Sequence, residues 1–302
     1  MSGLVLAIFG PTASGKTAVA EALAERLPGD VVSADAMQAY RGLPILTNQP
    51  GRPTRLVGIW PLEHEGSVGE YQRLAHQAVD EILAAGRAPI VAGGTGLYLR
   101  AALGDLDLPP APPPGARESW ERLYDTEGAE RAHAVLAERD AAAAAAVHPN
   151  DRRRVVRALE LADAGSSLHS PSDRLWSKET RAPTLIVGLD VPPAELERRI
   201  EVRTRAMAER GAAEEARAAL AGRISASAAK VIGVEEFARL PEEQAIAAVT
   251  LRTRRYAAYQ RKWLRRIPDA VSVAADRPPD AVADAILEVA RARQRLLAPR
   301  AG

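Results

Sequence analysis

The clearest chemical signal in this sequence is a phosphate-binding segment close to the N-terminus. Residues 10–17 read GPTASGKT and match the pattern GxxxxGK[ST] at every fixed position. In such a loop, glycines permit a turn whose N–H groups point at phosphate oxygens, the lysine adds a full positive charge and the final hydroxyl binds magnesium. We therefore expect Mg²⁺ at Thr17 and a phosphate group surrounded by Gly10, Pro11, Thr12, Ala13, Ser14, Gly15, Lys16 and Thr17.

The loop by itself does not identify the phosphate donor, because nucleotide hydrolases, kinases and some pyrophosphate-using transferases share it. Nucleotide hydrolases usually have an acidic residue at the end of a later apolar strand, where it organises magnesium. The best later strand here, Pro89–Ala92, runs into Gly93-Gly94-Thr95-Gly96 without a carboxylate. This pattern argues against a nucleotide hydrolase.

A carboxylate follows another apolar run, because Asp35 ends the segment VVSAD. Open parallel sheets bind their ligands at the carboxyl ends of the strands, so Asp35 is expected to face the phosphate loop. There it either accepts a proton from a weakly basic amine or helps to bind magnesium. The alternative is a structural role as the N-cap of the following segment. The role as a base is favoured.

The elements that must position these residues follow an α/β pattern. An apolar run at Leu4–Phe9, the glycine-rich turn and an amphipathic helix at Ala18–Leu27 form the first unit of a parallel sheet. Further strands are predicted at Val31–Ala34, Leu56–Ile59, Pro89–Ala92, Thr184–Leu189 and Ala270–Val273. The predicted fold is a P-loop parallel sheet flanked by helices.

A change of pattern predicts a helical insertion in this fold. The Pro-rich stretch LPPAPPPGA leads into an alanine-rich helical segment and then a helix at Arg152–Ala164. We assign residues 1–107 and 184–302 to the catalytic core, whose C-terminal part is helical. Residues 108–183 form the insertion.

The segment Leu251–Arg266 is the leading candidate for an RNA surface, since it is rich in Arg and Lys and has no acidic residue. On a helix, one cationic stripe suited to a phosphate backbone is formed by Arg254, Arg261 and Arg265. An aromatic stripe is formed by Tyr256, Tyr259 and Trp263. These rings either pack into the core, which is the favoured interpretation, or stack on unpaired bases.

The composition excludes some classes of protein. The chain of 302 residues has no cysteine, which rules out disulfides and thiolate metal sites and fits a reducing cytosol. Its 40 Lys plus Arg balance 39 Asp plus Glu, so the formal charge of +1 says nothing about an anionic partner. No apolar run approaches the roughly 18 residues of a membrane span, and the N-terminus lacks the basic leader of an export signal. We expect a cytoplasmic protein without a membrane partner.

Five segments in a fixed order are similar to the motifs of one enzyme family. They read GPTASGKT, SADAMQAYRG, GGTGLYL, HPNDRRRVVRALEL and TRRYAAYQRKWLRR. The sequence therefore resembles the tRNA dimethylallyltransferases, also called isopentenyl transferases. The resemblance implies transfer of a dimethylallyl group from dimethylallyl pyrophosphate to N6 of adenosine 37, next to the anticodon. It further implies that the tRNAs read codons beginning with U and that the product is N6-isopentenyladenosine.

The resemblance also implies roles for individual residues. Lys16, Thr17 and Asp35 stand at catalytic positions: the first two bind the diphosphate and Mg²⁺, and Asp35 is the general base for the adenine amine. Thr95 and Lys230 lie near the pyrophosphate. Contacts to the tRNA anticodon stem-loop, beside the cationic stripe, are implied for Gln38, Tyr40, Arg41, Asn150 and Arg152. The family habit is a monomer without an obligate protein partner.

Some positions depart from the family pattern or have a second interpretation. Relatives have a GYKE-like motif where this chain has Lys230–Glu236, reading KVIGVEE, and Leu46–Arg55 is shorter than its counterpart. Asn150 and Asp151 equally suit a cap for the helix that starts at Arg152. Two other functions remain open: a P-loop small-molecule kinase or nucleotide hydrolase, and a non-catalytic RNA-binding protein.

Overall fold

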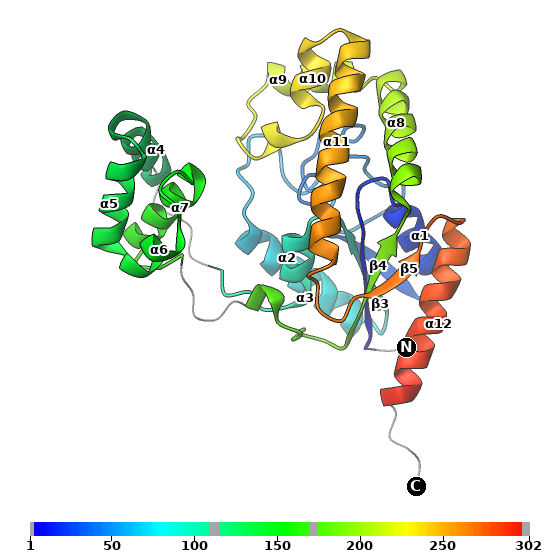
Figure 1. Cartoon of the computed structure of the whole chain (residues 1–302). Helices are drawn as coiled ribbons and strands as arrows, with labels where there is room; N and C mark the ends of the chain where they lie inside the picture. The colour runs from blue at the N-terminus through cyan, green and yellow to red at the C-terminus, as the bar shows by residue number, and fades with distance from the viewer. Residues whose placement is uncertain (1–2, 109–114, 169–173, 298–302) are drawn as a thin grey trace. The chain divides into compact units, whose positions relative to one another are not determined.

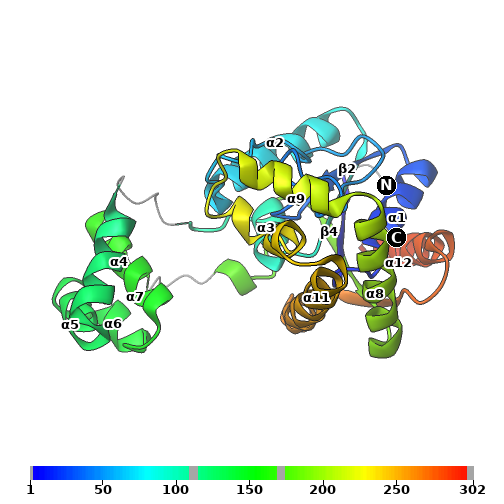
Figure 2. The same ribbon diagram turned by 90° about the horizontal axis from the view of Figure 1, so that it is seen from above.

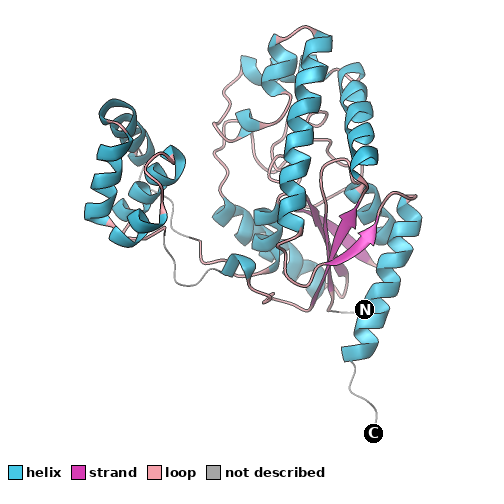
Figure 3. Cartoon of the chain, viewed as in Figure 1, coloured by secondary structure: helices cyan, strands magenta, loops and turns pink. Residues whose placement is uncertain are grey.

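The computed structural model of this chain describes residues 3–108, 115–168 and 174–297. The described residues divide into two compact units. The larger unit contains the residues up to Asp105 and from Leu175 onward, and the smaller unit contains Leu106–Arg174. Figure 1 labels the elements of each unit, and Figure 3 separates helices from strands.

A parallel sheet of five strands lies at the centre of the larger unit, in the order β2-β3-β1-β4-β5. The strands are β1 Val5–Phe9, β2 Gly29–Ser33, β3 Ala88–Gly93, β4 Thr184–Asp190 and β5 Val271–Ala274. Since all four pairings are parallel, the carboxyl ends of the strands meet at one edge. The predicted α/β fold with a parallel sheet is confirmed.

One predicted strand, Leu56–Ile59, is wrong. Only isolated bridges occur near this segment, from Arg55 to Val32 and from Trp60 to Tyr40. The reason is local: Leu56 has φ 65° and Gly58 has φ 62°, and strands cannot contain left-handed residues. The segment is therefore an irregular connection between β2 and α2.

Helices cover both faces of the sheet, as Figure 2 shows. The helices of the larger unit are α1 Lys16–Arg26, α2 Val68–Ala84, α3 Gly96–Leu103, α8 Pro193–Glu209, α9 Ala212–Ala221, α10 Val234–Arg239, α11 Glu242–Leu264 and α12 Pro279–Leu297, with 3₁₀ turns at Arg174–Trp176 and Ala228–Lys230; α9 and α10 pack on α8, α11 and each other rather than on the sheet. On one face, α1 and α12 bury Leu23 and Ile286 against Leu6 and Ile8 of β1. On the other face, α2 and α3 bring Tyr71 and Tyr98 together, with ring centroids 4.4 Å apart. None of the described helices is long and apolar enough to cross a membrane.

A second apolar cluster joins α8, α9, α10 and α11 to the loop that follows β2. Leu46 of this loop packs in the same cluster as Met207, Phe237 and Val249. The Glu215 carboxylate of α9 accepts hydrogen bonds from the N–H groups of Ile45 and Leu46 at 2.8–3.1 Å. The loop is thereby held where its next residues face the edge of the sheet.

The smaller unit is helical, with α4 Ala116–Glu127, α5 Ala129–Arg139, α6 Ala141–Ala146 and α7 Arg152–Asp163. The polyalanine run forms α6, and its Ala143 and Ala144 pack against Leu136 and Leu159. Small side chains permit the short α6 to approach the other helices closely.

The predicted insertion, 108–183, extends further along the chain than the smaller unit does. Residues 175–183 belong to the larger unit, because the buried Arg100 donates to the carbonyls of Leu175 at 2.9 Å and Ser177 at 2.7 Å. The N–H of Arg181 also donates to the carbonyl of Leu103 at 2.8 Å. Most of the Pro-rich stretch, 109–114, lies outside the described residues.

Candidate active site

The phosphate loop connects β1 to α1 as the motif requires. Gly15, the residue before α1, has φ 89°, a left-handed conformation that L side chains rarely adopt. A Cβ on Gly10 would lie 2.7 Å from the Ser14 Oγ, so the loop closes too tightly for any larger residue there. The Ser14 hydroxyl is buried, and no described residue hydrogen-bonds it. The interior of the loop therefore holds a hydroxyl group that has no hydrogen-bond partner among the described residues.

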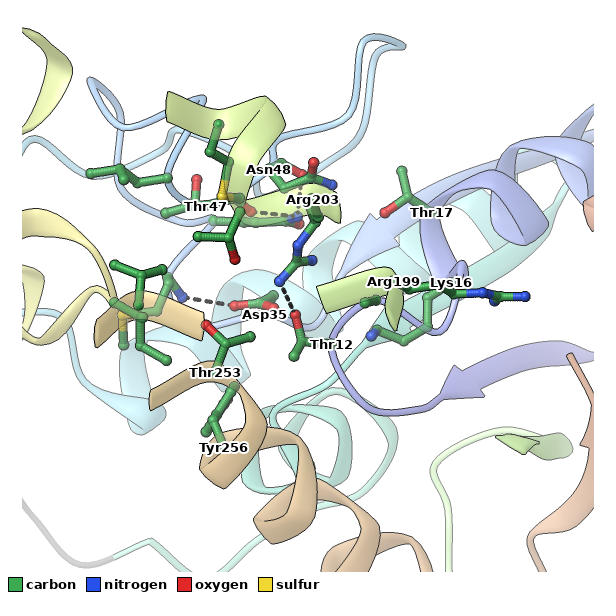
Figure 4. Close-up of a pocket in the computed structure, with 18 of the residues that line it drawn as sticks. Thr12, Lys16, Thr17, Asp35, Thr47, Asn48, Arg199, Arg203, Thr253 and Tyr256 are labelled. Atoms are coloured by element: carbon green, nitrogen blue, oxygen red, sulfur yellow. Dashed lines mark hydrogen bonds between the residues drawn. The ribbon is translucent and has the colours of Figure 1, made fainter. Parts of the chain in front are cut away.

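The loop forms one end of a cavity of about 350 Å³. Four other segments complete it: Asp35 to Asn48 after β2, one side of α8, Val231 and Ile232 before α10, and one side of α11. Figure 4 shows labelled residues of the loop, of the segment after β2, of α8 and of α11 converging on this space. The cavity therefore lies at the carboxyl edge of the sheet, where parallel-sheet proteins bind their ligands.

Two half-buried cations and one carboxylate set the charge of this cavity. The Arg203 guanidinium of α8 donates to the Thr12 hydroxyl and points toward Asp35, while its Nε has no partner among the described residues (Figure 4). Burial lowers the pKa of Arg203 to about 10, against the raising effect of Asp35. Burial also lowers the pKa of Lys16 to about 8, again opposed by Asp35. Two desolvated cations facing one carboxylate favour an anionic ligand.

Asp35 lines the cavity but does not cap a helix. Its carboxylate accepts the N–H of Met37 at 3.0 Å, and turns rather than a helix follow. This Asx-type turn fixes the carboxylate at the end of β2, so the cap interpretation fails while the position facing the loop is as expected. Thr95 lies beside this turn, since its Oγ1 accepts the N–H of Ala36 at 3.4 Å.

A buried glutamine, Gln260 of α11, ties the loop to the turn after β3. Its Oε1 accepts the N–H of Thr12 at 2.7 Å, and its Nε2 donates to the carbonyl of Gly94 at 2.8 Å. A Cβ on Gly94 would lie 2.2 Å from this Nε2, so the glycine is needed for the amide to fit. One side chain therefore positions both the loop and the GGTG turn.

The far wall of the cavity is apolar. Its side chains come from the loop after β2, from α8, from the segment before α10 and from α11: Leu46, Met207, Val231, Ile232 and Val249. A ligand that fits this cavity has an anionic end on the phosphate loop and an apolar end on this wall.

Oxygen ligands for Mg²⁺ are present in the cavity. Both the Thr17 hydroxyl and the Asp35 carboxylate line it. The described residues contain no group of three or more His, Cys, Asp or Glu that could hold a metal by themselves. Mg²⁺ commonly takes one or two protein ligands and completes its shell with substrate phosphates and water, so this donor set fits Mg²⁺ bound together with a diphosphate.

The three predicted RNA contacts on the segment after β2 lie in different surroundings. Gln38 lines the cavity, and its amide donates to the carbonyl of Asn48 at 3.1 Å. Arg41 is exposed and donates to the carbonyl of Ile59 at 3.1 Å. Tyr40 is only 2% exposed and its hydroxyl accepts the N–H of Gly66 at 3.2 Å. The prediction that Tyr40 contacts RNA is wrong, because packing against Trp60 buries the ring.

Lys230 is exposed and does not line the cavity, although Val231 and Ile232 beside it do. The predicted contact of Lys230 with pyrophosphate is therefore not formed here. Where the sequence departs from the family pattern, Val234 is fully buried in the second apolar cluster. Glu236 accepts the N–H of Gly233 at 3.0 Å and pairs with Arg252 at 2.7 Å, so it stabilises this segment.

The predicted cationic stripe of α11 is not one continuous exposed surface. Arg254 is half-buried and lies 3.7 Å from Glu201 of α8. Arg261 and Arg265 line a second cavity, of about 630 Å³, beside β4 and β5. The favoured core interpretation of the aromatic stripe is wrong for Tyr259, which is 54% exposed, whereas Trp263 packs against Gly96 of α3 and Tyr256 is half-buried at the first cavity.

In the smaller unit, the predicted RNA contacts have structural partners. Arg152 pairs with Asp125 at 2.7 Å and with Glu121 at 3.4 Å. Asp151 accepts the N–H of Arg154 at 3.2 Å and caps α7, as its second interpretation proposed. Asn150 is exposed. Of these three residues, only Asn150 has a side chain that forms no hydrogen bond or ion pair with another described residue.

Sequence reasoning missed Arg203, Gln260 and Glu215. A signal for Arg203 was present, since α8 buries Leu196, Ile200, Thr204 and Met207 on one face and Arg203 lies on that same face. A charged residue within an apolar stripe indicates a buried role. Gln260 and Glu215 gave no comparable signal, because their partners lie far away in the sequence.

Comparisons with known proteins support a single family. The model of the IPP transferase family matches residues 38–267, and that of the isopentenyl transferase family matches residues 3–56. The chain is 42% identical to a tRNA dimethylallyltransferase of Anaeromyxobacter dehalogenans, over 91% of this chain and 96% of the relative. It is similar to the crystal structure of the tRNA isopentenylpyrophosphate transferase of Bacillus halodurans, with 30% identity, a TM-score of 0.68 and coverage of 98% and 99%. A eukaryotic dimethylallyltransferase captured acting on tRNA is 27% identical, with a TM-score of 0.73 over 91% of this chain and 74% of that chain.

Proposed function

Because this chain belongs to the IPP transferase family, we propose that it transfers the dimethylallyl group of dimethylallyl pyrophosphate to N6 of adenosine 37 in tRNA. The observation that carries the proposal is the two-ended cavity. One end has the phosphate loop with Lys16 and Arg203, the other has an apolar wall, and Asp35 lies on the same cavity. A five-carbon allylic diphosphate has the same polarity along its length.

The residues of the cavity suit a substitution at C1 of the donor. The adenine N6 attacks C1, the bond between C1 and the diphosphate oxygen breaks, and the leaving diphosphate keeps the bonding electrons. Lys16, Arg203 and the N–H groups of the loop stabilise the charge that grows on this leaving group. Asp35 accepts the proton that the attacking amine loses. Bound Mg²⁺, held by Thr17, would neutralise part of the diphosphate charge.

The fold disfavours the kinase and hydrolase alternatives. In those enzymes a strand beside the loop ends in a magnesium-binding acid. Here β3 ends at Gly93, where a Cβ would lie 2.0 Å from the carbonyl oxygen of Ala34. No acidic side chain fits at that position. We therefore propose that the donor is an allylic diphosphate rather than ATP.

The proposed partners are the anticodon stem-loop of tRNA and dimethylallyl pyrophosphate, without an obligate protein partner. The anticodon loop requires a surface for unpaired bases, and the target base must leave its stack to enter the cavity. A tRNA substrate places the proposed reaction in the cytoplasm.

The test is transfer of radiolabelled dimethylallyl pyrophosphate to unmodified tRNA in the presence of Mg²⁺, with ATP consumption measured in parallel. We expect label on one adenosine of the anticodon loop and loss of transfer in Lys16→Ala, which removes a charge from the diphosphate site. ATP turnover without label would instead establish a kinase or hydrolase. Tight tRNA binding without either activity would establish a non-catalytic RNA-binding protein.

A further inference from the structure

A continuous row of aromatic rings leads away from the candidate active site. The centroids of Tyr256 and Tyr259 are 6.5 Å apart with an interplanar angle of 24°, and those of Tyr259 and Trp263 are 6.4 Å apart. Trp176, from the 3₁₀ turn before β4, continues the row at 4.9 Å from Trp263. We call these four residues the aromatic ladder. It spans two turns of α11 and one separate segment.

The inner end of the ladder belongs to the active-site cavity. Tyr256 lines the cavity, and its hydroxyl lies 3.4 Å from the Thr95 Oγ1. Trp263 packs on the start of α3, where a Cβ on Gly96 would lie 2.2 Å from its ring. These two rings are fixed by the residues that form the site. Tyr259 lies between them and is 54% exposed, so its ring is available to a ligand.

Positive charge follows the ladder on one side. At about 100° per residue, Arg255 and Lys262 lie within about 20° of each other around α11, and about 40° to 60° from Tyr259. Arg266 follows the end of α11 at Leu264. All three are exposed. Arg255 and Lys262 form no ion pair with any other described residue, and the Arg266 guanidinium lies 3.8 Å above the Trp176 ring. By the same geometry, the side of the helix opposite the aromatic rings carries Arg254, Arg261 and Arg265.

We propose that the aromatic ladder is a stacking surface for the unpaired nucleotides next to the target adenosine, with a base resting on Tyr259 and phosphates facing Arg255 and Lys262. The inference rests on the proposed function and specifies where its RNA substrate binds. Rings with a parallel row of unpaired cations match single-stranded RNA, which offers flat bases joined by phosphates. Continuity with the cavity at Tyr256 places the stacked base beside the one that reacts.

The test is a cycle between one protein change and one RNA change. Anticodon stem-loops are prepared with normal bases or with an abasic nucleotide on either side of the target adenosine, and KM and kcat for transfer are measured. Tyr259→Ala should raise the KM for the normal stem-loop about 5- to 160-fold, the range for loss of one stacked base. On the stem-loop that lacks the stacked base, the same variant should change KM less than twofold. Tyr259→Phe should behave like the native protein, because the ring and not the hydroxyl stacks.

A matched control separates stacking from a general loss of exposed apolar surface. Val202 of α8 lies outside the candidate RNA segment and is 57% exposed, close to the value for Tyr259. Val202→Ala should leave the KM for every stem-loop unchanged. An equal effect of Tyr259→Ala on normal and abasic stem-loops, or no effect on either, would overturn the ladder while native transfer upholds the proposed function. Absence of transfer by the native protein would refute the proposed function itself.

Discussion

Replacement of Gln260 by leucine tests whether one buried amide holds the phosphate loop in position. The change retains most of the side-chain volume but removes both hydrogen bonds, to the N–H of Thr12 and the carbonyl of Gly94. A buried group left unpaired costs about 1–3 kcal/mol. The two groups together would cost about 2–6 kcal/mol. Because Thr12 is only half-buried, we expect a total in the lower half of that range, about 3 kcal/mol.

This free energy converts to a shift in melting temperature. The entropy of unfolding is about 2.1 cal/mol/K per residue, which for the roughly 230 residues of the larger unit gives about 0.5 kcal/mol/K. Gln260→Leu should therefore lower the Tm by about 6 °C. It should also weaken pyrophosphate binding, because the loop loses the contact that fixes Thr12.

The assay is thermal unfolding with and without pyrophosphate, followed by calorimetric titration of pyrophosphate. Thr250→Val is the control, since Thr250 lies on the same helix and its buried hydroxyl has no hydrogen-bond partner among the described residues. That variant should have a Tm equal to or above that of the native protein. If Gln260→Leu melts within 1 °C of Thr250→Val and binds pyrophosphate equally well, the amide does not hold the loop.

Three further predictions concern charge and capping. Asp35→Asn should lower kcat about 10²- to 10⁴-fold in single-turnover transfer, the usual contribution of a general base, with donor affinity within a fewfold of the native value; a native kcat would contradict its role. Lys16 has a pKa of about 8 in the free protein, so it is charged below that pH and neutral above it. Pyrophosphate affinity should fall as pH rises through 8 and should fall less in Lys16→Arg, and calorimetric profiles of equal slope would refute this. Asp151→Ala removes the cap of α7 and should destabilise the smaller unit by about 1 kcal/mol in urea unfolding, whereas no change would leave the cap without energetic weight.

The parts of this protein that follow from sequence are those that local rules determine. An apolar run, a glycine-rich turn and an amphipathic helix leave few alternatives for residues 4–27, and β1 and α1 form where expected. The position of Asp35 follows from sequence because open parallel sheets bind their ligands at the carboxyl ends of the strands. The failure at Leu56–Ile59 has the same origin, because left-handed residues at Leu56 and Gly58 leave no mark in apolar periodicity.

The missing parts of the site are those that depend on tertiary contacts. Arg203 reaches Thr12 across 191 positions, and Gln260 reaches it across 248. The spacing of the arginines predicts a helix at α11, and this helix forms. The sequence does not say which side of the helix faces a neighbour. The partner of Arg254 is Glu201 on α8, so this arginine turns inward while Arg255 remains exposed.

Arg100 and Leu103 of α3 form hydrogen bonds to the returning chain at Leu175 and Arg181. These bonds have a consequence for how the chain can change during evolution. The chain leaves the larger unit after α3 and returns at backbone atoms hydrogen-bonded to that same helix. Because closing a longer loop adds only about 0.6 kcal/mol per doubling of its length, the sheet is nearly indifferent to how many residues lie between. The helical unit is thus a module that evolution can lengthen, shorten or exchange while the chemistry of the larger unit is left intact.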